Sequence, residues 1–315
     1  MTFSPFGNDL FGMPIVQRND SPVAQQFLMP PFSVLSARDG LWQDRKRAWL
    51  KMGIKGEVGR DKDLLYGEGV DSLDFYRKKE GIRDTSEESN TSVFDPVLCE
   101  LMYSWFNPKG GQIIDPFAGG SVRGVVASCL GMDYWGCELR PEQVDENRLQ
   151  IEALCKGRKP RYVCGDSRLF MDAAPQADFM FSCPPYGDLE VYSDDKNDLS
   201  NMKWDDFVSA YGEIIGKSCQ RMKENRFACF IVGDFRDPKG FYRNMISLTT
   251  SLFDEHGMHL YNEGILVTPV GSASMRVTKQ FEVSRKFAKT HQNILIFCNG
   301  DPKLATQAIN KGAFE

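Results

Sequence analysis

Residues 112–121 read QIIDPFAGGS and combine a short apolar run, an acidic residue and a glycine-rich turn. Such a run, followed by glycines and then a helical period, is typical of a buried parallel strand that leads into a helix. Glycine lets the backbone approach a ligand closely, and the start of the helix offers N–H groups to it. The dinucleotide fingerprint GxGxxG is not matched. A plain tight turn is the alternative interpretation.

Short apolar runs and helical periods alternate from Ser92 onward. This alternation predicts an α/β fold, Rossmann-like, with a doubly wound, mostly parallel sheet of seven strands. The predicted strands are 112–115, 134–138, 162–164, 179–182, 227–233, 261–268 and 293–298, and the predicted helices are 97–105, 121–130, 141–154, 204–223 and 241–253. Ligands bind such sheets beyond the carboxyl ends of the strands, where the strand order reverses.

The chain divides into four predicted parts. Residues 1–29 lack any period and are expected to form a flexible arm, and residues 30–90 form an N-terminal extension. The extension begins with a turn-rich stretch, PPFSVLSARDG, and continues into a short helix with Trp42 and Trp49 on one face, a spacing more typical of packing than of function. Residues 91–305 form the catalytic domain, and 306–315 a C-terminal tail.

The composition is that of an ordinary globular protein, with 42% hydrophobic and 26% charged residues among 315. No apolar run approaches the roughly 20 residues of a membrane-spanning helix. The N-terminus shows no secretion signal, and we expect a cytoplasmic protein. The nine cysteines are scattered without a CxxC pair, and His256 and His259 have no partner at ligand spacing, so neither disulfides nor a metal site is expected. A formal charge of −5 means that any nucleic-acid contact must come from a local basic patch.

Two further strands also end in acidic residues. Glu138 ends the second strand, 23 positions after Asp115, where an acidic side chain can accept the hydroxyls of a ribose. Asp166 ends the third strand, before Ser167, where it can accept a hydrogen bond from an adenine amino group. A helix N-cap is the alternative role for each acid. Three acidic strand ends in register favour a nucleotide-like ligand.

The fourth strand runs directly into Cys183-Pro184-Pro185-Tyr186. Consecutive prolines fix φ and present carbonyls without adjacent N–H donors, which makes a stiff corner. The Pro184 carbonyl is predicted to point at whatever lies beyond the strand, and Tyr186 can stack on a base.

These segments, in this order, resemble the DNA amino-methyltransferases, and the bacteriophage-type enzymes most closely. The resemblance covers about residues 92–303 and implies a class I methyltransferase fold with S-adenosylmethionine as cofactor. It implies cofactor contacts from the segment before the first strand, the glycine loop and the two later acids, which here are Ser92, Phe94, Asp115, Pro116, Phe117, Gly119, Gly120, Glu138, Asp166 and Ser167. It implies catalytic roles for Cys183, Pro184, Pro185 and Tyr186.

Two positions depart from the family pattern. The glycine loop has Gly119-Gly120-Ser121 where the family commonly has Ser or Thr between two glycines. The catalytic loop begins with Cys183, whereas adenine enzymes usually carry Asp or Asn there and cytosine-N4 enzymes Ser. The choice between adenine N6 and cytosine N4 therefore stays open, with adenine slightly favoured.

The implied reaction is a direct methyl transfer to an exocyclic amino group. Hydrogen bonds from the NH2 group to the Pro184 carbonyl and to the first loop residue would favour a nitrogen whose lone pair can attack. Cys183 is a weak acceptor, and more of this role falls on Pro184. A nucleophilic Cys183 is the alternative, but ring-carbon methylation uses a cysteine after a proline and the order here is reversed. In a duplex the target base must first be rotated out of the stack.

Contacts to DNA, expected to be double-stranded, require cations. A loop at about 269–292 is predicted to recognise DNA through Arg276, Lys279, Arg285, Lys286 and Lys289, with His291 as a further candidate. A solvated charged face is the alternative interpretation. Arg45, Lys46 and Arg47 form a smaller patch, and the acidic stretch 188–206 is expected to cap the cofactor or project away. Two other functions stay open, an RNA base amino-methyltransferase and a catalytically silent DNA-binding protein with this fold.

Overall fold

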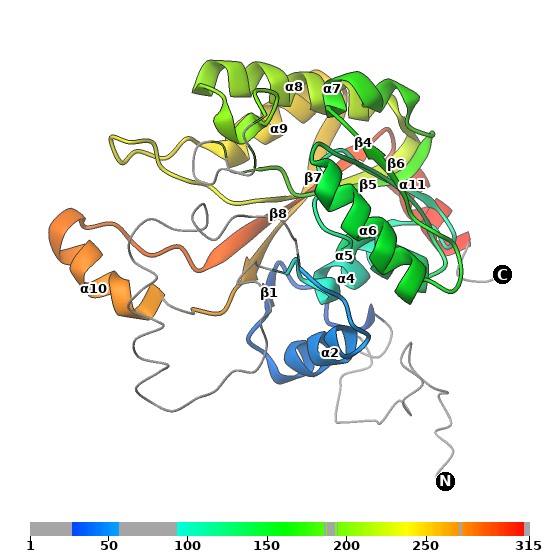
Figure 1. The fold of residues 1–315 in the computed structure, drawn as a ribbon, viewed down its shortest axis with the longest axis horizontal. Coiled ribbons are helices and arrows are strands. Elements are labelled where there is room, and N and C mark those ends of the chain that lie inside the picture. The colour runs from blue at the N-terminus through cyan, green and yellow to red at the C-terminus, as the bar shows by residue number, and fades with distance from the viewer. Residues whose placement is uncertain are drawn as a thin grey trace, which may run out of the picture.

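The computed structural model describes residues 27–56, 93–185, 187, 193, 195–270 and 273–311. These residues build one sheet in the order β1-β7-β8-β6-β5-β2-β3-β4 (Figure 1). The strands are β1 (Val34–Ser36), β2 (Gln112–Asp115), β3 (Asp133–Glu138), β4 (Arg161–Cys164), β5 (Ala177–Ser182), β6 (Met222–Val232), β7 (Met258–Val267) and β8 (His291–Asn299).

The sheet is doubly wound and mostly parallel, as predicted. Strand β2 pairs in parallel with β3 on one side and with β5 on the other, so the chain reverses its winding direction beside β2. Only β8 runs antiparallel to its neighbours, β6 and β7, among the described strands. A crevice at the carboxyl end of β2 is therefore the expected ligand site of this Rossmann-like arrangement.

The prediction of seven strands was wrong, because the described part of the chain adds an eighth. Val34 to Ser36 pair in parallel with Ile265 to Val267 at the sheet edge. Backbone bonds fix this pairing, since Ile265 N donates to Ser33 O at 2.7 Å and Ala37 N donates to Val267 O at 2.9 Å. A three-residue strand is too short to show a sequence period, and the prolines and serines around it indicated turns instead.

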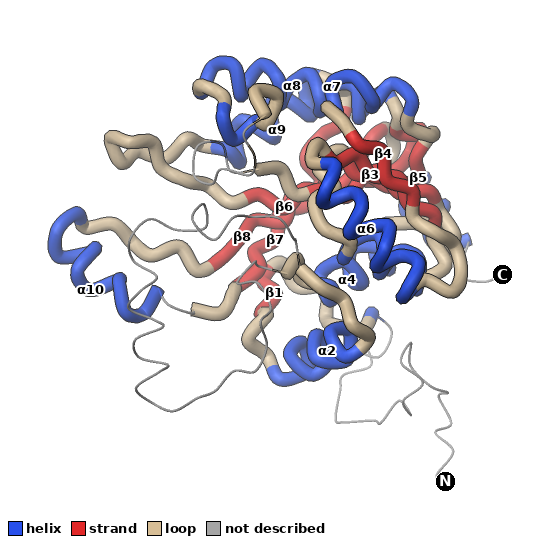
Figure 2. Tube along the Cα trace, in the orientation of Figure 1, coloured by secondary structure: helices blue, strands red, loops and turns tan. Residues whose placement is uncertain are grey.

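Helices cover both faces of the sheet (Figures 1 and 2). One face carries α2 (Gly40–Lys51), α4 (Pro96–Phe106), α5 (Val122–Cys129), α6 (Pro141–Leu154) and α11 (Pro302–Lys311). The other carries α7 (Ser167–Phe170), α8 (Trp204–Gln220) and α9 (Met245–Glu255), with the 3₁₀ turns η2 (Met171–Ala173) and η4 (Leu199–Asn201) beside them. Helix α10 (Ala273–Ser284) follows β7 and precedes β8 in the chain, and it projects away from the sheet. Helix α11 runs through residue 306, the predicted start of the C-terminal tail.

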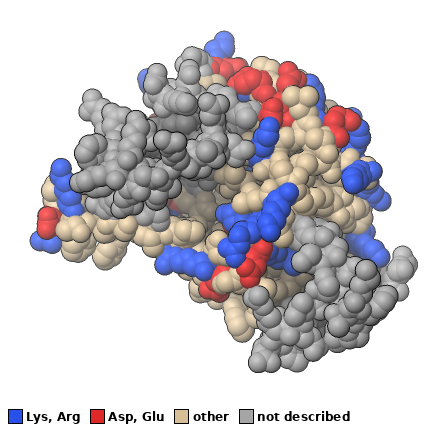
Figure 3. Space-filling model, turned by 60° about the horizontal axis from the view of Figure 1, so that its bottom comes forward, with Lys and Arg blue, Asp and Glu red and all other residues tan. Residues whose placement is uncertain are grey.

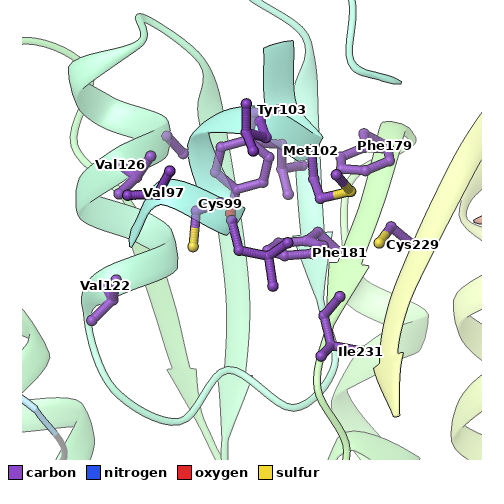
Figure 4. Packing of buried hydrophobic residues seen from close by; sticks show 14 of the residues in the cluster. Val97, Cys99, Met102, Tyr103, Val122, Val126, Phe179, Phe181, Cys229 and Ile231 are labelled. Carbon is purple, nitrogen blue, oxygen red and sulfur yellow. The ribbon is translucent and has the colours of Figure 1, made fainter. Parts of the chain in front are cut away.

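The first core packs α4 and α5 against the middle strands (Figure 4). Helix α4 begins at Pro96 because Asp95 caps it, accepting a bond from Val97 N at 3.0 Å. Tyr103 is fully buried and meets the Phe181 ring edge-on at 5.3 Å. Burying aromatic rings of this size stabilises the domain by about 2–3 kcal/mol each.

The second core lies on the opposite face. Phe253 of α9 stacks on Phe297 of β8 with centroids 3.9 Å apart and meets Phe230 of β6 edge-on at 4.9 Å. The three rings are fully buried. They hold α9 against β6 and β8, so the loop between β6 and α9 starts and ends on rigid elements.

Helix α2 of the N-terminal extension packs against α4. Trp42 and Trp49 are both fully buried, which confirms the packing interpretation of their spacing. Trp42 Nε1 donates to Asp95 at 3.1 Å and Trp49 Nε1 donates to Glu100 at 2.9 Å. Arg45 also pairs with Glu100, so part of the predicted second basic patch is already neutralised by α4.

No helix among residues 27–56, 93–185, 195–270 and 273–311 is both long and apolar enough to cross a bilayer. The same residues contain no group of three or more side chains suited to holding a metal ion. His259 does contact an acid, Asp254, but both side chains lie at the surface without a third ligand.

Candidate active site

A cleft opens at the carboxyl ends of β2 to β5, at the reversal point. It encloses about 870 Å³ including space open to solvent, within the range of about 300–1,000 Å³ for small-molecule sites. Ten predicted site residues line it, namely Phe94, Pro116, Phe117, Gly119, Glu138, Asp166, Ser167, Cys183, Pro184 and Pro185. The predicted cofactor loop and catalytic loop therefore share one cleft. Ser92 and Tyr186 lie outside the described residues.

Asp115 does not line the cleft. It is fully buried and accepts four hydrogen bonds, from Arg123 Nε at 2.5 Å, Tyr134 OH at 2.6 Å, Ser182 Oγ at 2.5 Å and Phe117 N at 3.2 Å. A carboxylate holds about four acceptor positions, and these contacts use them. Asp115 therefore shapes the loop from beneath rather than presenting its carboxylate to a ligand.

Arg123 joins that buried network to the cleft wall. Its guanidinium pairs with Asp115, donates to the Phe117 and Ala118 carbonyls, and lies 4.6 Å from the centre of the Phe94 ring. Burial alone would lower the pKa of Arg123, but the charge of Asp115, with Tyr134 and Cys183, raises that pKa well above its usual value. Arg123 was not among the predicted site residues, although its place in the first turn of the helix after the loop is a usable signal.

The glycine turn is held by the acid at the end of β3. Gly119 has a φ of 50°, a left-handed conformation that favours glycine. Gly119 N donates to Glu138 Oε2 at 2.9 Å, and Asn147 Nδ2 donates to Gly119 O at 2.7 Å. Gly120 follows but does not line the cleft. Glu138 also accepts from Arg140 N at 3.0 Å, so its carboxylate faces the cleft in a fixed orientation.

Asp166 has a partner that the sequence did not reveal. It caps α7 by accepting from Arg168 N at 2.9 Å, and its carboxylate also pairs with the Arg168 guanidinium at 2.6 Å. The hydrogen bond to Asp166 raises the pKa of Arg168. Ser167 Oγ donates to the Pro116 carbonyl at 2.5 Å and joins this strand end to the cofactor loop. The N-cap alternative for Asp166 is therefore real, beside its place in the cleft.

The predicted catalytic loop leaves β5 directly beneath the cleft. Pro184 is buried, and Cys183 and Pro185 are half-buried. Ser182, the last residue of β5, receives a bond from Phe117 N at 3.2 Å while donating to Asp115. One hydroxyl therefore fixes the spacing between the predicted cofactor loop and the proline corner.

The described part of the acidic stretch also reaches the cleft. Asn197, Asp198 and Leu199 line it, and Asn197 accepts from the Arg168 guanidinium at 3.2 Å. The described part of this stretch thus lies against the cleft, and its role as a cap over the cofactor stays a prediction. Asp188 to Tyr192 and Asp194 lie outside the described residues.

The predicted DNA-contacting residues lie away from the cleft, on α10 and the segment that returns to β8. Lys279 and Arg285 are exposed, whereas Lys286 and Lys289 are half-buried. Burial lowers the pKa of Lys289, and the negative charge of Asp234 partly offsets this decrease. Arg276 belongs to α10, but its side chain lies outside the described set. About half of the predicted recognition loop, Ala273 to Ser284, is thus a helix.

No protein-family model matches the chain, and no curated protein matches it. Among solved structures it is similar to TrmN from Thermus thermophilus, at 12% identity and a TM-score of 0.43 over 65% of this chain and 49% of that one. The chain thus spans about half the length of TrmN. It is also similar to a proposed RNA methyltransferase from Pyrococcus horikoshii, at 15% identity and a TM-score of 0.48 over 82% of this chain and 100% of that one. Magnesium protoporphyrin IX methyltransferase from Synechocystis, solved with bound S-adenosylmethionine, is similar at 12% identity and a TM-score of 0.40 over 84% of this chain and 94% of that one.

Proposed function

We propose that the chain is an S-adenosylmethionine-dependent methyltransferase that acts on the exocyclic amino group of a base in DNA. The observation that carries this proposal is the shared cleft, where the Gly119 turn and the Pro184 corner face the same space. The residues present suit such a cofactor, because a glycine turn, Glu138 and Phe94 all line that space. When bound, the cofactor supplies a methyl group on a sulfonium centre.

The chain's own residues would hold the two reactants. Glu138 is oriented by Gly119 and Arg140 to accept ribose hydroxyls. The Pro184 carbonyl would accept a bond from the base NH2 group, and Tyr186 would stack on the base. The lone pair of the neutral amino nitrogen is delocalised into the ring, which makes the nitrogen a poor nucleophile. This hydrogen bond would favour a more tetrahedral nitrogen whose lone pair can attack the methyl group.

RNA is a second candidate substrate. A structure of similar fold comes from a proposed RNA methyltransferase. On the face that Figure 3 shows, the described basic side chains lie in separate groups, with acids beside some of them, rather than in one continuous basic field. A continuous basic surface is typical of a protein that binds the phosphate backbone of duplex DNA. The DNA assignment and the likeness to phage enzymes therefore stay predictions.

Transfer of a tritiated methyl group from labelled cofactor separates the candidates. The chain is incubated with equal amounts of double-stranded DNA, single-stranded DNA and RNA, and the label in each polymer is counted. We expect label in DNA, which a Tyr186→Ala variant loses. Label in RNA alone would establish the second candidate, and label in no polymer would contradict a nucleic-acid substrate.

A further inference from the structure

The loop between β6 and α9 forms a hydrogen-bonded hairpin over residues 234–243. Arg236 pairs with Tyr242 in antiparallel fashion, and Asp237 N donates to the Phe241 carbonyl at 2.8 Å. The Arg236 guanidinium donates to the Gly240 carbonyl at 2.8 Å. The hairpin is therefore fixed by its own hydrogen bonds and holds its tip residues in place.

The hairpin presents aromatic rings to solvent. Phe241 is 71% exposed and Tyr242 42% exposed, while the Arg236 guanidinium lies 3.9 Å from the centre of the Tyr242 ring. Contiguous exposed apolar surface is typical of interaction sites, whereas singly scattered apolar residues are normal on a protein surface. A cation over an aromatic ring is the arrangement that single-strand-binding surfaces use beside their stacking rings.

The segment around α10 repeats this pairing. Phe281 and Phe287 stack with centroids 5.8 Å apart, and the Arg285 guanidinium lies 5.3 Å from the Phe281 ring. Phe287 is 76% exposed. Because Phe281 supports Phe287 from one side, the other face of the Phe287 ring is open to a planar partner. We call this segment, residues 273–289, the α10 arm.

The hairpin and the α10 arm touch each other. A Cβ atom placed on Gly240 would lie 2.8 Å from the Lys286 ammonium, so the tip of the hairpin sits against the arm. Both project from the same side of the molecule in Figure 1, the hairpin in yellow and the arm in orange. The exposed rings of the two segments therefore belong to one surface.

This surface begins at the catalytic loop. A Cβ on Gly187, the residue after Tyr186, would lie 2.8 Å from the Phe235 ring at the base of the hairpin. Phe235 in turn meets the Trp204 ring edge-on at 6.1 Å. A polymer whose target base entered the cleft beside Pro184 would thus continue onto the hairpin.

The charge of the surface suits a phosphate backbone. Its described side chains include seven cations, Arg236, Lys239, Arg243, Lys279, Arg285, Lys286 and Lys289, against three carboxylates, Asp234, Asp237 and Glu282. The whole chain carries a formal charge of −5, so this excess of positive charge is local. Phosphates are attracted to such a patch, and interleaved rings add stacking.

We propose that the hairpin and the α10 arm form a binding surface for an unpaired strand of DNA next to the target base. Bases of the strand stack on Phe241 and Phe287, and its phosphates contact Lys239 and Lys286. A duplex keeps its bases stacked on one another and cannot offer their faces to these rings, whereas an unpaired strand can. The inference rests on the proposed function for the DNA substrate, but strand binding is measurable without methyl transfer.

The test measures the affinity of the full chain for a fluorescein-labelled 20-nucleotide single strand of DNA, with the matched duplex and the RNA of the same sequence in parallel arms. The variant is F241A/F287A, and the matched control is Phe32→Ala, an equally exposed ring at 71% near β1. We expect the double variant to bind the DNA strand at least about tenfold more weakly, and the control to bind it like the parent. The slope of affinity against salt should stay unchanged in the double variant and become shallower in K239Q/K286Q.

Cofactor binding is measured on the same samples by calorimetry. If cofactor binding fails while F241A/F287A still weakens strand binding, the proposed function falls and the surface stands. If the double variant binds the DNA strand as tightly as the parent, or if the duplex binds as tightly as the single strand, the inference is overturned. Binding of the RNA strand alone would overturn DNA as its occupant.

Discussion

Arg123 Nε lies 2.5 Å from Asp115 Oδ2, and both side chains are buried beneath the loop that joins β2 to α5. The pair connects three parts of the fold, since Asp115 also accepts from Tyr134 of β3 and Ser182 of β5. The floor of the cleft is therefore set by ionic and hydrogen-bond contacts, and its walls combine apolar residues with polar ones such as Glu138 and Asp166.

Breaking this pair from one side should destabilise the fold. Arg123→Met leaves the Asp115 charge buried with one partner fewer, and we expect a loss of about 3–5 kcal/mol in the free energy of unfolding. Urea denaturation measures it. The control is Arg148→Met, which breaks an exposed pair with Asp145 and should change stability by less than about 1 kcal/mol. Equal effects of the two variants would contradict the structural role of the buried pair.

Glu138 should matter for cofactor affinity more than for stability. Glu138→Gln replaces one carboxylate oxygen with an NH2 group that only donates, so one oxygen is left to accept from Gly119 N, Arg140 N and a ribose hydroxyl. We expect calorimetry to show at least about tenfold weaker binding of S-adenosylmethionine, since hydrogen bonds to charged groups contribute about 1.5–3 kcal/mol. Glu152→Gln, at a surface pair with Lys159, provides the matched control and should bind normally. Unchanged affinity in Glu138→Gln would remove this residue from the cofactor site.

Cys183 should be dispensable for chemistry. It lines the cleft but stands before the prolines, and we predict direct transfer without a covalent intermediate. Cys183→Ala should therefore keep methyl transfer within about tenfold of the parent, a change of about 1.4 kcal/mol in the barrier. A loss of many orders of magnitude, together with a trapped covalent adduct, would show instead that the thiol is the nucleophile.

Asp178 should contribute to stability in a pH-dependent way. Although burial alone would raise the pKa of Asp178, hydrogen bonds from Lys223, Gln112 N and Arg226 lower it overall. A carboxyl whose folded pKa is depressed stabilises the fold above its unfolded value of about 3.9, and this contribution is lost as the pH falls through the folded pKa. Asp178→Asn should thus be less stable than the parent at pH 7, and the gap should close below about pH 4. A gap that does not change between pH 7 and pH 3 would contradict this assignment.

Much of the sheet could be predicted from sequence because its strands are strongly apolar. The predicted bounds of β2 and α6 are reproduced, at 112–115 and 141–154. The predicted helix 241–253 began too early, since α9 starts at Met245 and Phe241 and Tyr242 belong to the hairpin. Apolar residues just before a helix fit the helical period of the sequence whether they belong to the helix or to the preceding loop. The period alone therefore did not show where α9 begins.

The site was predictable as a set of strand ends, but its internal contacts were not. Parallel strands bring their carboxyl ends together, so Asp115, Glu138 and Asp166 had to lie near one another. Which carboxylate faces the cleft depends on side-chain partners from elsewhere in the chain. Arg123 forms an ion pair with Asp115, and Arg168 forms one with Asp166. The pattern of apolar residues along a strand predicts neither pair.

The central claim is most directly tested by mass spectrometry of nucleosides after reaction with a cofactor that carries a deuterated methyl group. The chain is incubated with the DNA that accepts label, the polymer is digested, and the modified nucleoside is identified by fragmentation. The account predicts the deuterated methyl group on the exocyclic nitrogen of adenine or cytosine. A methyl group on a ring carbon, or a chain that does not bind the cofactor, would contradict it.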